Sequence, residues 1–270
     1  MIIFKSINKL NKEVNFKANI GFVPTMGSLH KGHISLINSS KKVCKKTLVS
    51  IFVNPTQFDK KKDLRNYPKN LKKDLRILKK LNVDFLLIPR VKNIYKNKKD
   101  KKIKLDKKDI ILCSLYRPGH FEGVLAVINQ FLKNIKPSYI FLGEKDYQQQ
   151  YLIRNFIKKK FKVKVFLCKT IRDKNNIALS SRNNLLNKSD LKKSSHIASS
   201  LINFKNKLKR NFYLKNKLID LKKKLNNINN IKIEYLEIRN SRNLTRKFNK
   251  HNFKIFLAYY NKNVRLIDNY

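Results

Sequence analysis

Acidic side chains, glycine and tryptophan are scarce in this sequence of 270 residues. It has 17 Asp and Glu against 64 Lys and Arg, a formal net charge of +47, with 6 Gly and no Trp. Such a charge normally indicates a nucleic-acid partner. The lysines are nevertheless dispersed, in groups such as Lys41–Lys42, Lys72–Lys73, Lys98–Lys99 and Lys222–Lys224, and no stripe alternates them with aromatic residues. With the excess of Asn and Ile, this favours drift in coding composition, as in an AT-rich genome. We expect only nonspecific polyanion binding that weakens as salt rises.

Cysteine is rare, and long apolar runs are missing. Cys44, Cys113 and Cys168 have neither CxxC nor metal-ligand spacing, so we expect free thiols in a reducing compartment. The segment Met1–Lys5 lacks the basic region and apolar core of a signal peptide, and no stretch of about 18 apolar residues occurs. These absences favour a soluble, cytoplasmic protein.

A strand, a tight loop and a helix start follow one another near the N-terminus. Ile20–Val23 is a short apolar run, Pro24 and Gly27 should break it, and from Leu29 the apolar spacing suits a helix. A helix start presents unpaired N–H groups and a partial positive charge. This segment therefore favours binding of phosphate groups.

Two histidines mark that helix start. His30 and His33 are three residues apart, so both rings should lie on one face and donate to the same phosphate oxygens. Gly32 has no Cβ, which would let an adenine or ribose approach the backbone. The alternative is a pair of ordinary surface histidines beside a helix cap. The H-x-G-H pattern resembles that of the nucleotidyltransferase superfamily, which indicates a reaction type and no particular substrate.

Polar amides follow the next predicted strand, Thr47–Val53. In a parallel sheet such a strand end faces the ligand crevice. Asn54 and Gln57 could hold a small polyol acid by its hydroxyl and carboxylate. The competing interpretation is plain Asn-Pro turn chemistry.

The same layout recurs at Ser138–Leu142, a predicted strand that ends at Gly143–Asp146 before a helix from Tyr147. Lys145 can place a positive charge near phosphate, and Gln149 can face the same crevice one turn later. In so lysine-rich a chain, only the position after strand and glycine distinguishes Lys145.

Two further segments are candidates. After a strand at Val163–Leu167 and a turn at Ile171–Asn176, the triplet Ser180–Arg182 offers two hydroxyls and a guanidinium to a triphosphate, or it is an ordinary helix cap. The segment Tyr116–Gly123 is predicted to be a turn-rich loop carrying Arg117, with a plain surface loop as the alternative.

Strands alternate with helices through residues 1–170, including a helix over Leu71–Leu81 and a strand over Val83–Ile88, which predicts a doubly wound parallel sheet. Residues 171–270 predict a smaller α+β domain. Its helices are capped by Asn187–Asp190 and reach about Asn227, and its strands are Ile231–Ile238 and Phe253–Tyr260. The lysine-rich stretch Tyr95–Asp109 is expected to be a solvated insertion or mobile loop.

Six segments then occur in one order: V-P-T-M-G (23–27), L-H-K-G-H (29–33), V-S-I-F-V-N-P-T-Q-F (49–58), R-P-G-H-F (117–121), G-E-K-D-Y-Q-Q (143–149) and A-L-S-S-R-N (178–183), with L-I-D-N at 266–269. In this set, order and spacing the chain resembles the pantothenate synthetase family over nearly its whole length. The family joins pantoate to β-alanine, with ATP cleaved to AMP and diphosphate through a pantoyl adenylate. The resemblance implies a Rossmann-like catalytic domain, a C-terminal lid domain and a homodimer formed through the N-terminal domain.

The resemblance also implies roles for individual residues. His33 would be the proton donor, His30 would steady the phosphates, and Lys145 would stabilise the charge that develops on them. Gln57 would contact pantoate and β-alanine with Asn54 beside it, and Gln149 would hold pantoate from the other side. Mg²⁺ would enter on the ATP phosphates, since the sequence shows no carboxylate cage. The implied ATP-binding residues are Met26, Gly27, Ser28, Leu29, His30, Lys31, Gly32, His33, Gly143, Glu144, Lys145, Asp146, Ile171, Leu179, Ser180, Ser181 and Arg182.

Some positions depart from the family pattern. Asn175–Asn176 stands where Asp-Gly is usual, but Asn tolerates positive φ and a tight turn can survive. Leu115 and Tyr116 replace polar residues, and Glu122 replaces a basic or small one. Two rival interpretations stay open: another adenylating or cytidylyl-transferring enzyme of the superfamily, and a basic RNA-binding protein that has lost activity.

Overall fold

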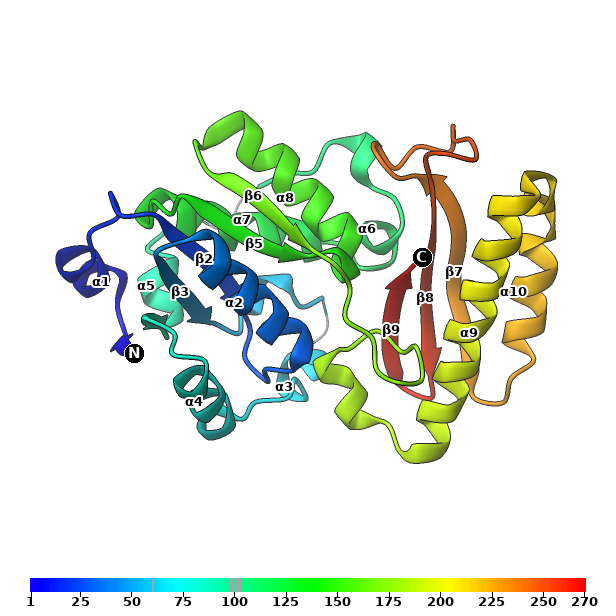
Figure 1. Ribbon diagram of the computed structural model, residues 1–270, viewed down its shortest axis with the longest axis horizontal. Coiled ribbons are helices and arrows are strands. Elements are labelled where there is room, and N and C mark those ends of the chain that lie inside the picture. The colour runs from blue at the N-terminus through cyan, green and yellow to red at the C-terminus, as the bar shows by residue number, and fades with distance from the viewer. Residues whose placement is uncertain (60, 98–99, 101–102) are drawn as a thin grey trace. The chain divides into compact units, whose positions relative to one another are not determined.

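The computed structural model describes residues 1–59, 61–97, 100 and 103–270. These residues form two units, Met1–Lys169 and Thr170–Tyr270, which are described separately below (Figure 1). Lys98–Lys99 and part of the predicted loop at 95–109 lie outside the described residues.

The first unit is built on a six-stranded sheet in the order β1-β4-β3-β2-β5-β6, whose neighbouring strands pair in parallel (Figure 1). Its strands are β1 (Ile2–Phe4), β2 (Ile20–Thr25), β3 (Lys46–Ile51), β4 (Phe85–Leu87), β5 (Tyr139–Gly143) and β6 (Lys164–Cys168). The predicted parallel sheet is therefore confirmed, and β1 is an addition at its edge.

Helices lie on both faces of this sheet. Neighbouring residues of a strand point to opposite faces: Phe22 packs edge-on against Phe131, while Val23 belongs to the apolar cluster that includes Ile37. Phe131 and Ile37 belong to α7 and α2, which therefore cover opposite faces, as in a doubly wound fold. The helices of this unit are α1 (Ile7–Glu13), α2 (Lys31–Val43), α3 (Lys61–Arg65), α4 (Leu71–Lys80), α5 (Val91–Ile94), α6 (Cys113–Tyr116), α7 (His120–Asn134) and α8 (Tyr147–Lys160), with 3-10 turns η1 (Pro55–Gln57), η3 (Lys107–Asp109) and η4 (Glu144–Asp146).

Pro24 does not end β2, contrary to the prediction. The pairing of β2 with β3 continues through Pro24 to Thr25, whereas its pairing with β5 stops at Phe22. Proline has no N–H to donate to a neighbouring strand. The consequence is that β2 and β5 separate toward their carboxyl ends while β2 and β3 stay joined.

The prediction of a loop over Tyr116–Gly123 is wrong for most of its length. Only Arg117–Gly119 lies between α6 and α7, with Gly119 at φ +80°. Gly123 is helical, and a Cβ there would lie 2.2 Å from the Thr56 carbonyl oxygen. This glycine therefore lets α7 pack closely on η1. Tyr95, at the start of the predicted solvated stretch, is buried with 6% of its surface exposed.

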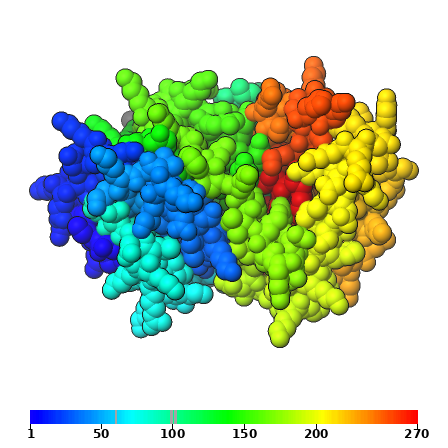
Figure 2. Space-filling view, in the orientation of Figure 1, coloured from blue at the N-terminus to red at the C-terminus, as the bar shows by residue number. Residues whose placement is uncertain are grey.

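The second unit is a three-stranded antiparallel sheet whose core packs against two helices, α9 (Lys188–Arg210) and α10 (Leu218–Asn226), seen on the surface in Figure 2. Asn187 caps α9 as predicted, its side chain accepting from Asp190 N at 2.9 Å. The strands are β7 (Ile231–Asn240), β8 (Phe253–Asn261) and β9 (Val264–Asn269), and the 3-10 turns are η5 (Ser181–Leu185) and η6 (Phe212–Lys217). The sequence prediction missed β9. None of the helices in the described ranges is long and apolar enough to span a membrane.

Candidate active site

The sheet of the first unit reverses its order between β2 and β5. From β2 the chain proceeds outward through β3 and β4, then returns to the other side of β2 with β5 and β6. Ligands of open α/β sheets bind beyond the carboxyl ends of the strands at this reversal. The loop Met26–His30 follows β2, and η4 follows β5, so both segments predicted to bind ATP in this unit lie at that point.

His30 is the N-cap of α2. Its Nδ1 accepts a hydrogen bond from Gly32 N at 3.1 Å, and Nδ1 of His33 accepts one from His30 N at 3.3 Å. The two rings lie together, with centroids 4.1 Å apart, which confirms that they share one face. Helix α2 thus begins at Lys31, two residues after the predicted start.

These bonds fix the tautomer of both rings. Because each Nδ1 accepts from a backbone N–H, a neutral ring carries its proton on Nε2. Burial, followed by the Lys145 ammonium, lowers the pKa of His30 to about 4. Burial and then His30 lower the pKa of His33 to about 3. Both rings are therefore neutral near pH 7, and each presents one Nε2–H donor.

The structure shows a reason for glycine at position 32 that the sequence analysis does not give. A Cβ at this position would lie 2.8 Å from Cε1 and 2.9 Å from Nδ1 of His30. The missing side chain makes room for the capping ring itself. At Gly143, by contrast, a Cβ would meet no described atom within 4 Å, so the space beside the end of β5 is open.

Lys145 and Asp146 form an ion pair beside the histidines, with Nζ 3.2 Å from Oδ1. Burial raises the pKa of Asp146, but the Lys145 ammonium, with smaller contributions from His120 and His33, lowers it overall. The carboxylate is thus ionised, and its charge in turn opposes the lowering of the His30 and His33 pKa values. An anionic phosphate group bound here would lie near the Lys145 ammonium and two neutral N–H donors.

The loop before His30 is held by Asp74, a residue that the sequence analysis did not identify. The Asp74 carboxylate, on α4, accepts from Ser28 N at 2.8 Å and from Leu29 N at 2.7 Å. With the amides of His30 and Gly32 bonded to ring nitrogens, four N–H groups around the helix start are already engaged. These four amides are therefore not the unpaired donors that the sequence predicts.

Asn54 follows β3, which ends at Ile51, and caps η1, and its amide is engaged inside the protein. Its Oδ1 accepts from Tyr95 OH at 2.9 Å and from both N and Oγ1 of Thr56, at 3.3 and 2.9 Å. Its Nδ2 donates to Gly123 O at 3.0 Å and to Gln57 Oε1 at 3.3 Å. A carbonyl oxygen has two lone pairs, so this amide is saturated and orients Gln57.

Gln57 links the loops that follow β3 and β2. Its Nε2 lies 2.9 Å from Sδ of Met26. Its backbone carbonyl accepts from Nδ1 of His120 at 2.6 Å, and Nε2 of His120 lies 3.1 Å from the Arg117 guanidinium. Arginine only donates, so His120 accepts at Nε2. Arg117 is buried and pairs with Asp59 at 3.4 Å, and it also donates to Gln57 O at 3.5 Å, so it supports the Gln57 backbone.

The first two glutamines of α8 differ in their partners. Gln148 is buried and bonds to backbone atoms of Cys113 and Ile111, at 3.0 and 2.7 Å. Gln149 is half-buried, and its side chain has no hydrogen-bond partner among the described residues. Its amide is thus available to a ligand, consistent with the predicted role.

In the second unit, Ser180–Arg182 follows a hairpin. Arg172 and Ala178 form an antiparallel bridge, and Leu179 N donates to Ile171 O at 3.0 Å. Asn176 has φ +64°, which confirms that Asn can replace glycine in this turn. Ser180 caps η5 by accepting from Arg182 N at 3.3 Å, and Ser181 is buried.

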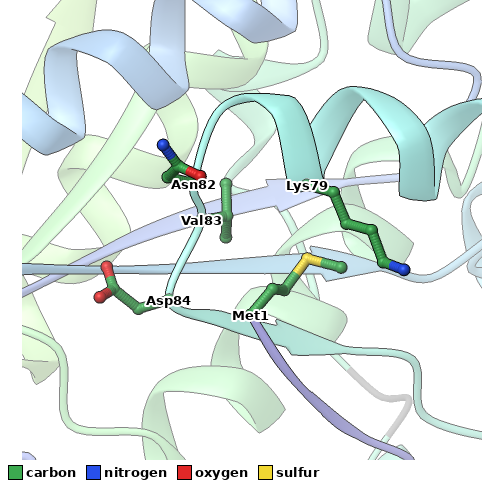
Figure 3. Close-up of a pocket in the computed structure, with 5 residues that line it drawn as sticks. All are labelled: Met1, Lys79, Asn82, Val83 and Asp84. Atoms are coloured by element: carbon green, nitrogen blue, oxygen red, sulfur yellow. The ribbon is translucent and has the colours of Figure 1, made fainter.

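A surface pocket elsewhere is lined by Met1, Lys79, Asn82, Val83 and Asp84 (Figure 3). It lies before β4, at the amino ends of the strands and away from the histidines. The Asp84 carboxylate already binds Lys46 Nζ and Thr47 N, at 2.8 and 2.9 Å. We therefore assign no catalytic role to this pocket.

The strand order and the paired histidines define a doubly wound α/β protein with a candidate nucleotide site at its topological reversal. The pantoate–β-alanine ligase family matches residues 2–270, and the chain belongs to this family. A pantothenate synthetase of Francisella philomiragia is 39% identical over 277 residues, covering 100% of this chain and 97% of its own length. One of Buchnera aphidicola is 47% identical over 196 residues, covering 69% of this chain and 68% of its own.

Solved structures agree over the full length. The pantoate–β-alanine ligase of Francisella tularensis, in complex with beta-gamma ATP and β-alanine, is 38% identical and superimposes with a TM-score of 0.84, covering 100% of this chain and 97% of that one. The pantothenate synthetase of Thermus thermophilus is 26% identical with a TM-score of 0.89, covering 100% of this chain and 99% of that one.

Proposed function

We propose that this protein joins pantoate to β-alanine, with ATP cleaved to AMP and diphosphate through a pantoyl-adenylate intermediate. Family membership over residues 2–270 supports the reaction. The structural observation that carries the proposal is the pair of neutral histidines at the point where the sheet reverses, close enough to Lys145 for its charge to lower the pKa of both rings.

In the first step, the pantoate carboxylate attacks the α-phosphorus of ATP, and diphosphate leaves. Negative charge accumulates on phosphate oxygens, where preorganised donors stabilise it most. His30 and His33 supply hydrogen bonds from Nε2, and Lys145 supplies a compact positive charge. Since the pKa of His33 lies near 3, we assign it a hydrogen-bonding role in the free enzyme instead of that of a charged acid.

In the second step, the β-alanine amine attacks the acyl carbon of the adenylate, and AMP leaves. No covalent enzyme intermediate is required, so positioning of the acid supplies much of the rate. Gln57 and Gln149 hold pantoate in this proposal, and Asn54 acts beside them by orienting Gln57.

Mg²⁺ would accompany the ATP phosphates. No group of three His, Cys, Asp or Glu side chains in the described ranges is arranged to hold a metal ion. Mg²⁺ is commonly bound through substrate phosphates and water. The triphosphate is therefore the proposed ligand of the cation, which would help to neutralise charge on the phosphates when bound.

The second unit is proposed to complete the ATP site. Ser180, Ser181 and Arg182 would close onto phosphates that first dock at His30 and His33. We also propose a cytoplasmic homodimer formed through the first unit. A monomeric sedimentation profile at working concentration would contradict the dimer without affecting the reaction.

The reaction is tested by AMP and diphosphate release from purified protein with Mg²⁺, ATP and D-pantoate, with and without β-alanine. We expect AMP release to require both substrates and to collapse in His33→Ala. The exposed His251 provides a control, since His251→Ala should leave turnover unchanged.

Two results would favour other functions. ATP cleavage that does not depend on pantoate would indicate a different adenylating or cytidylyl-transferring enzyme. An inactive, folded protein with salt-resistant, sequence-selective RNA binding would instead indicate a nucleic-acid-binding role, since nonspecific contacts weaken with salt.

A further inference from the structure

The motif Leu266–Asn269 takes no part in the proposed substrate contacts, yet it contains a buried carboxylate. Asp268 lies near the end of β9, and 7% of its side chain is exposed. Because acidic residues are few in this chain, the side chain that pairs with this carboxylate indicates what the carboxylate does.

That partner is Arg172, at the start of the hairpin that leads to Ser180. Nη1 of Arg172 lies 2.7 Å from Oδ2 of Asp268, and Nη2 lies 2.8 Å from Oδ1. Two parallel bonds of this kind fix the orientation of both planar groups. The guanidinium also lies over the ring of Tyr270, 4.6 Å from its centroid.

The same guanidinium also donates hydrogen bonds to backbone carbonyl oxygens of both the hairpin and β9. Nη1 donates to Asn176 O in the hairpin turn at 2.9 Å, and Nη2 donates to Asn269 O in β9 at 3.1 Å. One side chain thus joins the turn of the hairpin to the last strand of the sheet. Asn176, at φ +64°, is the turn residue that this bond holds.

The hairpin register determines where the phosphate-binding candidates begin. The bridge between Arg172 and Ala178, and the bond from Leu179 N to Ile171 O, set the position of Ser180 one residue later. Turn η5, which starts at Ser181, packs against β9. The hairpin before Ser180 and the turn η5 after it are therefore both held against the same strand, β9.

We propose that the Arg172–Asp268 ion pair is a positioning element for ATP, which holds the 171–179 hairpin in the register that presents Ser180–Arg182 to the triphosphate. This inference rests on the proposed function, because it takes that segment as the phosphate-binding one. Neither Arg172 nor Asp268 needs to touch the nucleotide.

A purely structural ion pair would behave differently, and the same unit offers a matched example. Arg265 and Glu234 join β9 to β7, and their side chains are 12% and 11% exposed. Removing one partner of a buried pair destabilises a protein. Loss of either pair should therefore lower the melting temperature, but only loss of the first should affect ATP.

The experiment compares Asp268→Asn and Arg172→Lys with Glu234→Gln. The readouts are ATP binding by calorimetry without pantoate or β-alanine, the KM values for ATP and pantoate, and hydrogen exchange of the hairpin amides of Ile177 and Leu179. We expect ATP binding to weaken about tenfold in the first two variants, the scale of a lost charge-assisted hydrogen bond. Exchange at the two amides should accelerate, and the KM for pantoate should stay within about twofold.

Equal loss of ATP affinity in Asp268→Asn and Glu234→Gln would overturn the inference, since the effect would then follow global stability. Arg172→Lys keeps the positive charge but loses the two-pronged geometry of the guanidinium. It therefore tests the positioning role if Asp268→Asn does not fold. Wild-type protein that binds ATP but makes no pantothenate would refute the proposed function alone, because calorimetry and exchange still decide the positioning role.

Discussion

The backbone N–H of Leu29 lies 2.7 Å from Oδ1 of Asp74, a residue 45 positions further along the chain. The other oxygen of this carboxylate accepts from Ser28 N at 2.8 Å. Between β2 and the histidines, Gly27 and Ser28 both have positive φ, at 79° and 51°. A non-glycine residue in this region is strained, and Asp74 supplies the contacts that hold it.

Asp74→Asn should therefore disturb the histidine loop. The amide would place an NH₂ group against one of the two backbone donors and leave it unsatisfied, at a cost of about 1–3 kcal/mol in unfolding free energy. We also expect the KM for ATP to rise. The control is Asp84→Asn, which removes a carboxylate that accepts from Thr47 N at the amino ends of the strands. That variant should lose stability in urea unfolding but keep the KM for ATP; equal KM changes would refute a specific role for Asp74.

Sequence patterns were sufficient for the sheet apart from its edge strand β1, but not for this contact. The apolar, β-branched runs at 47–53 and 138–142 end at polar segments, and parallel strands bring such ends to one edge. Asp74 was missed because its partners are distant backbone amides. One signal was available: Leu71, Asp74 and Leu78 share helical spacing, so an acid lies in line with the apolar positions of a lysine-rich helix.

Other features depended on tertiary contacts that no local pattern encodes. Gly119 and Gly123 suggested a loop, yet Gly123 lies inside α7 because the helix packs on the Thr56 carbonyl. Strand β9 has its sheet partner in β8, and its sequence was recognised only as a motif. The saturation of the Asn54 amide depends on Tyr95, which the sequence placed in a solvated stretch.

The lowered pKa values of the histidines predict an acid-sensitive fold. The folded pKa of His33, about 3, lies below its ordinary value of 6.5, so the unfolded chain binds more protons between these values. Stability should fall as pH drops below about 6.5 and continue to fall toward the folded pKa. His33→Gln should reduce the slope of the unfolding free energy against pH by an amount that corresponds to up to about one bound proton. The slope is measured by urea unfolding from neutral pH to about pH 4.

The control for that measurement is His251→Gln, at an exposed position. It should retain the wild-type slope. If both variants show the same slope as wild type, His33 does not remain neutral in the folded protein, and the assignment of its Nε2–H as a neutral donor is wrong.

The neighbouring glutamines of α8 should separate binding from stability. Gln149 has no side-chain hydrogen bond within the described part of the chain, so Gln149→Ala should leave the melting temperature nearly unchanged. The KM for pantoate should rise by roughly tenfold, as expected for a lost hydrogen bond to a charged ligand. Gln148→Ala should instead destabilise the protein by about 1–3 kcal/mol, because Cys113 N loses its acceptor. An unchanged pantoate KM in Gln149→Ala would remove this residue from the acid pocket.

Gly32 and Gly143 allow a similar test of the nucleotide site. A Cβ at Gly32 would lie 2.9 Å from Nδ1 of His30, so Gly32→Ala should displace the capping ring and destabilise helix α2 by about 1 kcal/mol, the usual value of an N-cap. A Cβ at Gly143 would meet no described atom within 4 Å, and its φ of −85° is open to alanine. Gly143→Ala should therefore fold normally in thermal melts yet weaken ATP binding, because the added methyl group occupies space that the proposal gives to the nucleotide. Wild-type ATP affinity in this variant would place the nucleotide away from the end of β5.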